Sequence, residues 1–527
     1  MKIYLACIVI ISMILLGAFA QGATFNVSTT QELRQALLGA AQNGQSDTII
    51  LANGTYATTD DGGGTFIYLD NENYNLTIQG SSAENVILSG VNTHQVLNIN
   101  VINYNVLISL DSLSIKNGFS TVSGGGFYTN ENLIMQNCKI FDNTTTNGDG
   151  GGFYAGSLNV GTVTISNSTI SYNIATCISS CYNLGGGFFV GGTATISNST
   201  ISNNIMNSEN GGAGGFYASE SVIISNSIVS NNTAGDLGGG FRTPYTSTVS
   251  NSIITGNKAG VGGGGFYSGP TNVTSSIISD NNAESNRGGG FYIGNQSSYD
   301  STVLKNCIIS GNSSFEEGGG FFSYDDVTLI NSIIINNGLN EGIYLYDEIN
   351  KIFNSAFINN GTYHINGDIN STVTVYNNYI DELKIGIPAF KKDNISSGNL
   401  DFVDQPNGDF HIGANSILID AGTINFEGVT FPDTDLDGYE RIWGIVIDIG
   451  PYEYIDDDFD GLQNYLEDKI CTDPFDADSD NDGIMDGDED CDNDGFTNAE
   501  EVQCASDPGD SRSRCFKGLP WLMLLLE

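Results

Sequence analysis

Basic residues are scarce in this chain of 527 residues, where 17 Lys and Arg stand against 61 Asp and Glu for a formal net charge of −44 at pH 7. Such an acidic chain repels the phosphates of nucleic acids and anionic lipids, so neither is expected as a partner. Histidine is rarer still: His94, His364 and His411 are scattered and offer no metal-ligand or nucleophile–base spacing.

Long apolar runs are missing beyond the N-terminal residues, so no transmembrane helix is expected in the mature chain. Residues 1–20 have the features of a signal peptide, because Lys2 precedes the apolar run Ile8–Leu16 and a small-x-small cleavage site ends at Ala20. An N-terminal membrane anchor is the alternative. The apolar tail at 516–527 is too short to span a bilayer, and the sequence leaves open whether it is a sorting or docking tail, a buried strand or a truncated end.

Cysteine is sparse, with nine residues that become an even number once Cys7 leaves with the signal peptide. Cys177 and Cys181 lie in one loop and are predicted to pair, which suits an oxidising compartment. Four further cysteines allow two more bridges of open connectivity: Cys471, Cys491, Cys504 and Cys515. Cys138 and Cys307 occupy equivalent positions six repeats apart. They are expected to be free, because about 29 Å of stacked strands would separate them and a disulfide needs Cα atoms within about 7 Å.

Helical periodicity is nearly absent from the body, which is rich in Gly, Asn, Ser, Thr and β-branched residues instead. Such a composition favours short strands and tight turns. The exception is Thr29–Ala41, a predicted amphipathic helix in which Thr29 and Glu32 match a capping box. A helix at this position would cover the open strand edge of the structure that follows.

Two sequence signatures repeat along the body. Gly-Gly-Gly-Phe or a close variant ends at Phe127, Phe153, Phe188, Phe216, Phe241, Phe266, Phe291 and Phe321. Asn-Ser-x-Ile or a degenerate copy begins at Asn137, Asn167, Asn198, Asn226, Asn251, Ser275, Asn306, Asn331 and Asn354. An Asn follows each of these nine starts by six residues: Asn143, Asn173, Asn204, Asn232, Asn257, Asn281, Asn312, Asn337 and Asn360.

A repeat of mostly 25 to 30 residues with several short strands cannot bury its own apolar face, whereas stacked copies can. The repeat therefore predicts an all-β fold, a right-handed parallel β-helix over residues 21–398, with the Phe residues stacked inward. The Asn residues are expected at tight corners, where Asn tolerates the left-handed conformation and can bond to the coils above and below. A β-propeller is the alternative, although its blades are usually longer.

These features resemble a known group of proteins. Ser28–Tyr56 and the repeated coils are similar to the pectin-lyase-like right-handed β-helix superfamily, in the style of chlamydial-type polymorphic outer membrane proteins. Residues 399–454 resemble the "choice-of-anchor" module through Gly408–His411, Ile419–Thr423, Asp435–Arg441 and Asp448–Glu453. The resemblance implies an exported bacterial protein of the cell surface, outer membrane or exterior, and it implies no reaction.

The region 455–515 contains three D-x-D-x-D-G loops with an acid at position 12. The predicted ligands are Asp456, Asp458, Asp460 and Glu467 in the first loop; Asp478, Asp480, Asp482, Asp486 and Glu489 in the second; and Asp490, Asp492, Asp494, Asn498 and Glu501 in the third. Alternate residues of a tight loop point inward, the Gly permits the bend, and a hard cation accepts six to eight oxygens, so Ca²⁺ is the expected cofactor. The loops resemble thrombospondin type 3 repeats or dockerin-like loops. A solvated acidic linker is the alternative.

The residues that follow the inward Phe positions should point outward, since strand side chains alternate. The aromatic ones among them are Tyr128, Tyr154, Phe189, Tyr217, Tyr267, Tyr292 and Phe322, a predicted surface stripe for stacking on sugars or proteins. Loops that cover the stripe are the alternative.

The sequence thus favours a surface adhesion or scaffold protein that contacts a cell-surface glycan or protein. A carbohydrate-binding protein, or a polysaccharide lyase or hydrolase, is the second hypothesis, although few charges lie in the coils.

Overall fold

The computed structural model describes residues 22–515, apart from short gaps at 71–72, 102–105, 158–159, 178–184, 209–210, 295–300, 339, 347–348, 369, 427, 471, 505 and 514. The predicted signal peptide at 1–20 and the apolar tail at 516–527 lie outside the described residues. Within the described part of the chain, no helix is both long and apolar enough to cross a membrane.

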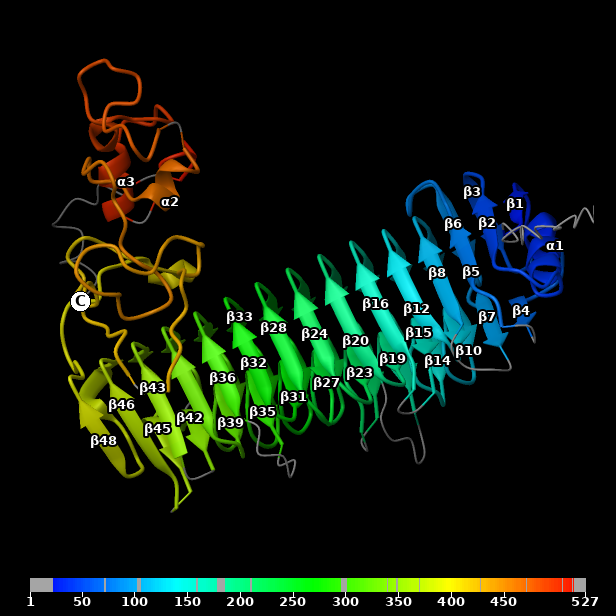
Figure 1. Cartoon of the computed structure of the whole chain (residues 1–527), viewed down its shortest axis with the longest axis horizontal. Helices are drawn as coiled ribbons and strands as arrows, with labels where there is room; N and C mark the ends of the chain where they lie inside the picture. The colour runs from blue at the N-terminus through cyan, green and yellow to red at the C-terminus, as the bar shows by residue number, and fades with distance from the viewer. Residues whose placement is uncertain are drawn as a thin grey trace, which may run out of the picture.

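The body is a solenoid whose coils each contribute one strand to several parallel sheets (Figure 1). One coil runs through β16 (Thr162–Ser166), β17 (Thr169–Ser171), β18 (Ile174–Thr176) and β19 (Phe188–Val190) before the next begins at β20 (Thr193–Ser197). Counted over the described residues, sheet A has 15 strands, from β1 (Thr24–Val27) to β48 (Ala389–Lys392), and sheet B has 13, from β3 (Gly54–Ala57) to β47 (Tyr379–Ile380). Sheet C has 12, from β4 (Phe66–Asp70) to β45 (Tyr363–Gly367), and sheet D has 8, from β10 (Phe119–Ser120) to β38 (Ser313–Ser314). The predicted parallel β-helix is confirmed.

The inward Phe residues set the register of sheet C. Phe127 pairs with Phe153, and Phe153 with Phe188, so that equivalent residues stack directly on one another. Ring centroids along the column lie 4.6 to 5.4 Å apart, and all the rings are buried. The column therefore forms one continuous strip of the core, as the repeat predicts.

The Asn that follows each signature by six residues forms a second buried column. Nδ2 of Asn173 donates to Oδ1 of Asn204 at 3.0 Å, and the same bond recurs between successive Asn residues from Asn143 to Asn360. The left-handed backbone lies at other residues: the first residue of the signature, where Asn167 has φ 48°, and the residue before the column, where Asn203 has φ 56°. The sequence predicts Asn residues that combine a left-handed backbone with bonds to the coils above and below. In the structure, these two properties belong to different residues of the coil.

The Ser of each signature forms a third column, in which its hydroxyl accepts the backbone N–H of the coil before. The N–H of Ser168 donates to Oγ of Ser199 at 3.1 Å. Cys138 and Cys307 replace Ser in this column and are buried and free, as predicted. Their own N–H groups donate to the next Ser in the same way.

The glycine run before each Phe is explained by close backbone approach. A Cβ on Gly151 would lie 2.5 Å from the carbonyl oxygens of Gly186 and Ile174, closer than real Cβ atoms come. Gly150 adds a φ of +67°, which side chains disfavour. Glycine therefore lets this segment pack closely against the backbone of the next coil, both at its sheet D strand, which contains Ile174, and at its own glycine run.

The entry to the solenoid is covered as predicted. Helix α1 (Thr30–Ala40) begins at the N-cap Thr29, whose side chain forms a capping box with Glu32. Its apolar face, which includes Leu33 and Leu37, is buried against the first strands. The helix therefore blocks an edge that would otherwise be open to pairing.

The chain after β48 turns back onto the solenoid. An antiparallel hairpin of β49 (Phe402–Asp404) and β50 (Asp409–Ile412), joined by η2 (Gln405–Asn407), precedes an extended segment. Together they cover the outer face of sheet B in the last coils with one apolar cluster: Ile308, Ile333, Ile335, Ala356, Ile358, Tyr379, Phe410, Ile412, Leu418, Ile449 and Tyr452. Residues 399–454 thus pack on the solenoid.

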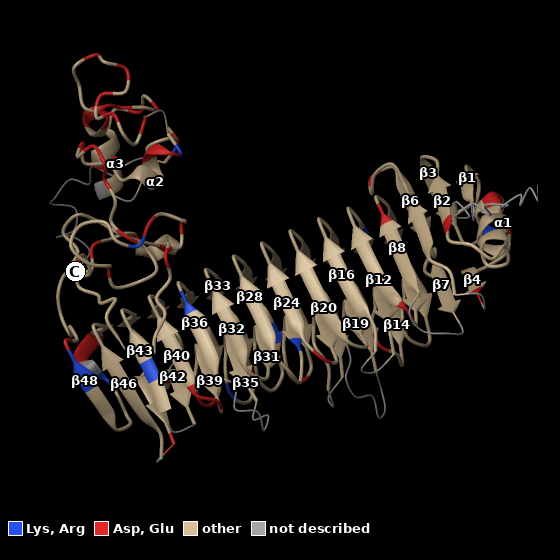
Figure 2. Cartoon of the chain, in the orientation of Figure 1, with Lys and Arg blue, Asp and Glu red and all other residues tan. Residues whose placement is uncertain are grey.

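The acidic region follows as a small unit with little regular structure, built around α2 (Asn464–Glu467), η3 (Asp486–Asp488) and α3 (Asn498–Gln503). It projects from the C-terminal end of the solenoid (Figure 1). Acidic residues concentrate there, whereas the coils carry few charges (Figure 2). The acidic residues that cluster near the end of the sequence therefore also cluster at one end of the molecule.

Candidate metal centre

The three predicted loops share one backbone conformation. The glycine of each has a positive φ, 96° at Gly461, 93° at Gly483 and 99° at Gly495. In the second loop, the N–H groups of Asp482 and Gly483 donate to the two carboxylate oxygens of Asp478 at 3.0 and 2.9 Å. The D-x-D-x-D-G pattern therefore folds into a turn that gathers its own carboxylates.

The alternate acids of each loop converge. Carboxylate oxygens lie within 4.8 Å of one another in four groups: Asp456, Asp458 and Asp460; Asp460, Glu467 and Asp486; Asp478, Asp480 and Asp482; and Asp490, Asp492 and Asp494. These groups contain the alternate acids that the spacing predicts, but Asp486 joins the first loop, and Glu501, predicted for the third loop, lies outside them. Glu489 lies outside these groups, and the acids of its own loop contribute, after burial, to its raised pKa.

The acids at position 12 of the first and third loops are buried. Glu467 is 1% exposed, and among the described residues neither of its carboxylate oxygens has a hydrogen-bond partner. Burial, followed by the charges of Asp460 and Asp458, raises its pKa to about 8. Burial likewise raises the pKa of Glu501 to about 7. Burial of this kind disfavours the charged carboxylate, and either protonation or a bound cation would compensate for it.

The residues at position 9 brace their loops. Oδ1 of Asn464, Asp486 and Asn498 each accepts the backbone N–H of the second loop residue, at 3.1, 2.9 and 3.2 Å. Asn498 also donates Nδ2 to the carbonyl oxygen of Asp486 at 2.7 Å, which ties the third loop to the second. Asp486 and Asn498, both predicted as ligands of their own loops, thus already have structural bonds.

The donor set fits a hard cation. The four groups contain only carboxylates, without His or thiolate, which is the chemistry that Ca²⁺ prefers over softer metals. Residues of all three loops would hold such ions, which would neutralise the crowded acids and fix the turns. No ligand beyond these side chains is assigned.

Disulfides also tie this region. Cys504 and Cys515 form one bridge, with Cα atoms 5.6 Å apart. Cys491 and Cys177 are each disulfide-bonded as well. Cys471 and Cys181 lie outside the described residues, so the predicted Cys177–Cys181 pairing stays a prediction.

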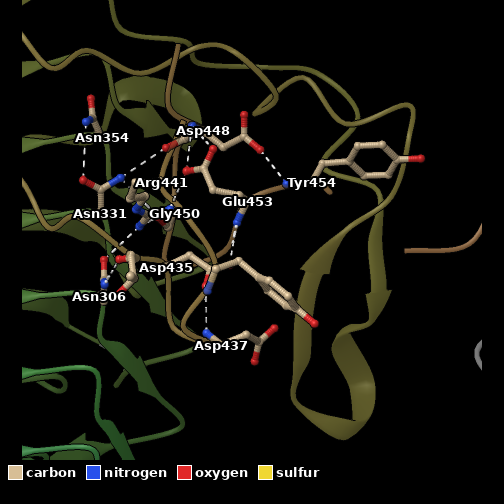
Figure 3. Close-up of polar contacts among 12 residues, drawn as sticks. Asn306, Asn331, Asn354, Asp435, Asp437, Arg441, Asp448, Gly450, Glu453 and Tyr454 are labelled. Atoms are coloured by element: carbon tan, nitrogen blue, oxygen red, sulfur yellow. Dashed lines mark hydrogen bonds and ion pairs between the residues drawn. The ribbon is translucent and has the colours of Figure 1, made fainter. Parts of the chain in front are cut away.

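A buried ion pair fixes the segment that carries the acidic unit (Figure 3). Arg441 is 3% exposed and donates to Glu453 at 2.6 Å, to the carbonyl oxygen of Gly450 at 2.6 Å and to Oδ1 of Asn306 at 2.8 Å. Asn306 and its equivalent in the next coil, Asn331, also donate to backbone carbonyls of this segment. The corner asparagines of the last coils are thus the docking points.

The junction between the docked segment and the first loop is aromatic. The ring of His411 lies between those of Tyr452 and Tyr465, with centroids 3.8 and 3.7 Å away. Its nitrogens contact Asp409 at 2.5 Å and Asp437 at 2.7 Å. Tyr465 belongs to α2, so the first loop is attached directly to the docked segment that covers the end of the solenoid.

The predicted aromatic stripe is only partly correct. Successive rings do stack, for example Tyr154 on Phe189 at 4.6 Å. Phe189, Tyr217 and Phe322 are nonetheless buried, at 1%, 3% and 0% exposed, and this contradicts a fully exposed surface stripe. Neighbouring side chains cover these rings: Ala213 packs on the first two, and Tyr324 meets Phe322 at 4.9 Å. The remaining rings are half-buried: Tyr128, Tyr154, Tyr267 and Tyr292.

The basic groups on this face are already paired. Arg242 lies 3.4 Å from Asp236 and stacks over Tyr267, and Arg287 pairs with Glu317 and stacks over Phe322. Their acidic partners, Asp236 and Glu317, lie outside the strands, in loops whose path the fold fixes.

No protein-family model and no curated protein sequence matches the chain. Among solved structures it is similar to pectate lyase Pel9A, at 15% identity and a TM-score of 0.32, over 82% of this chain and 97% of that one. The A-module of mannuronan C-5 epimerase AlgE6 from Azotobacter vinelandii matches at 12% identity and a TM-score of 0.31, over 70% and 95%. The PL6 family alginate lyase AlyGC matches at 12% identity and a TM-score of 0.17, over 71% and 80%. The likeness is one of β-helix fold alone.

Proposed function

We propose that this protein is an exported β-helix of the cell surface or exterior that acts as an adhesion scaffold, and that Ca²⁺ stiffens its C-terminal unit into a stalk. One observation carries the proposal: carboxylates converge in three consecutive loops, and the buried Glu467 lacks a partner for either oxygen among the described residues. Without cations, these acids repel one another with little local compensation.

The character of the coils supports a scaffold. Their interior is filled by columns of identical side chains, and the arginines on the outer face of sheet C are engaged in ion pairs. A hydrolase would need two carboxyl groups at a set separation on an open surface. The surface of the coils is instead sparsely charged (Figure 2).

Calorimetric titration of the mature chain with Ca²⁺ tests the proposal. Up to three ions should bind, and Asp482→Asn combined with Asp494→Asn should weaken binding while the melting temperature of the β-helix changes little. The matched control is Asp473→Asn combined with Asp488→Asn, which removes the same charge outside the convergent groups. Absence of calcium binding by the unmodified chain would leave the acidic region as a solvated linker.

Glycan binding is the second candidate, supported by one pocket. A cavity of about 280 Å³ on the outer face of sheet C is lined by Gln95, Asn98, Asn100, Val122, Ser123 and Tyr128. Amide groups beside an aromatic ring are the chemistry that recognises sugars. A glycan array with Ca²⁺ and with chelator, run beside a uronate-release assay, separates binding from lyase or hydrolase activity. No glycan binding on the array and no uronate release would reject this second candidate function.

A further inference from the structure

We propose that Asp460, Glu467 and Asp486 form one composite calcium site, and that the ion bound there locks α2 against the end of the solenoid. The inference rests on the proposed calcium binding. It adds that the first site needs a carboxylate from the second loop, and that this site connects the acidic unit to the β-helix.

The three carboxylates come from separate segments. Asp460 is part of the first loop, Glu467 ends α2, and Asp486 begins η3 after the second loop, yet their oxygens lie within 4.8 Å of one another. Glu467 and Asp486 are 1% and 0% exposed. Both oxygens of Glu467 lack a partner among the described residues. A buried carboxylate facing two others in this way has the surroundings of a ligand to a divalent cation.

Asp486 is held in place by the second loop. Its carboxylate accepts the backbone N–H of Ser479 at 2.9 Å and the Ser479 hydroxyl at 2.5 Å. The next residue, Gly487, would place a Cβ 2.6 Å from the carbonyl oxygen of Asp460, so the two segments are in backbone contact. The first site is therefore complete only when the second loop is folded beside it.

The opposite side of α2 contacts the body. Tyr465 stacks on His411, and the hydroxyl of Tyr439 donates to Asp468 at 2.5 Å. Nε1 of Trp443 donates to Asp457 of the first loop at 3.0 Å. An ion that fixes Glu467 at the end of α2 thereby fixes the residues beside it that contact the docked segment, and this segment in turn packs on the solenoid.

Trp443 provides the measurement, because the chain has only two tryptophans and the other is Trp521. The experiment uses the full mature chain with Trp521→Phe, and follows the fluorescence of Trp443 during titration with CaCl₂. Asp486→Asn should raise the calcium midpoint at least tenfold and remove one ion from the calorimetric stoichiometry. Asp488→Asn is an exposed neighbour outside the groups, and should keep the midpoint within twofold.

Glu467→Gln separates ligation from folding. Gln has nearly the shape of the buried acid but cannot ionise beside Asp460 and Asp486, so this variant should keep or raise the melting temperature in chelator while raising the calcium midpoint at least tenfold. If both variants keep the midpoint and the ion count of the parent, the composite site is wrong and the proposed calcium binding still stands. If the parent itself binds no Ca²⁺, both proposals fall.

Discussion

At the scale of single residues, the solenoid depends on Asn side chains that accept a hydrogen bond from one neighbouring coil and donate a hydrogen bond to the other. Asn232 accepts from Asn204 and donates to Asn257, at 3.0 and 2.9 Å, so one residue type can repeat without limit. An acid could only accept and a lysine could only donate. The buried polar column is therefore fully satisfied, which makes it compatible with a core.

Asn232→Ala should destabilise the protein by about 3 kcal/mol or more, because three buried bonds to its side chain would be lost, from the backbone N–H and Nδ2 of Asn204 and to the carbonyl oxygen of Ile201. Denaturant unfolding followed by circular dichroism measures the change. Thr248→Ala, at an exposed position of sheet A, is the control and should cost less than about 0.5 kcal/mol. An equal effect of the two variants would contradict the role of the column.

Cys138 and Cys307 should resist alkylation in the folded protein, since burial raises the pKa of each thiol to about 12. At pH 8, a thiol with that pKa is about one part in ten thousand thiolate, the reactive form. Iodoacetamide labelling with mass spectrometry should find both unmodified before denaturation and both modified after it. A bridge between them would contradict the stacking register.

The sequence predicts that these columns exist, but it does not predict which Asn forms the hydrogen-bonded column and which one adopts the left-handed backbone. A fixed offset of six residues marks Asn204 and its equivalents as a ladder, because identical residues at identical offsets must stack in a solenoid. Asn203 and Asn204 are nonetheless the same residue type, and only the backbone separates them: Asn203 has φ 56°, whereas Asn204 forms the ladder. Because both residues are Asn, residue type alone cannot distinguish the two positions.

At the scale of elements, the outer face of sheet B changes character toward its end. Thr169 and Ser171 point outward early in the solenoid, whereas Ile333 and Ile335 occupy the equivalent positions of the docked coil. A strand that is apolar on both faces indicates burial on both. The run Ile333–Ile335 therefore carried a signal that something packs there. It carried no information on the partner, because contacts such as Arg441 with Asn306 span 135 residues.

Arg441→Met should release the docked segment, because it leaves Glu453 buried without its partner, a loss worth about 3–5 kcal/mol for such pairs. Limited proteolysis should then cut within 399–454 while the coils stay intact. The double variant Arg441→Met with Glu453→Met removes both charges and should recover much of the protection. Equal protease sensitivity of the single and double variants would contradict this account.

The His411 junction should weaken as pH rises. Burial lowers the pKa of His411, but hydrogen bonds and charges from Asp409 and Asp437 outweigh it, and the net shift is upward from 6.5. Tyr452 and Tyr465 cover the two ring faces. A raised histidine pKa gives stability that is complete below about 6.5 and is lost as pH rises through the folded-state value.

The thermal transition reported by Trp443 should therefore fall in temperature between pH 6 and pH 8.5 at fixed Ca²⁺. His411→Phe should flatten this dependence, and His94→Asn, far from the junction, should keep it. A transition that is equally pH-dependent in the Phe variant would place the titrating group elsewhere.

At the scale of the whole molecule, two regions that are stabilised in different ways, the coils and the acidic unit, meet at the C-terminal end of the solenoid. The coils are stabilised by nearest-neighbour stacking, which needs no ion, whereas the acidic unit has few apolar residues and many facing carboxylates (Figure 2). Its buried set includes Leu462, together with acids such as Glu467 and Glu501. Folding of this unit should thus be linked to ion binding, while folding of the coils should not.

Chelation of the mature protein should expand the acidic unit and leave the β-helix unchanged. The crowded carboxylates repel one another once the cations leave, so small-angle scattering should show a larger maximum dimension and protease should cut between Asp456 and Glu501. The melting temperature of the coils should stay almost constant, because none of their described strands contributes to a convergent acidic group. Readdition of Ca²⁺ should reverse both changes, and Mg²⁺ at the same concentration should do so less well, since it demands a smaller and stricter octahedral shell. If chelator alters neither dimensions nor cleavage, the acidic unit is not a calcium-stiffened stalk.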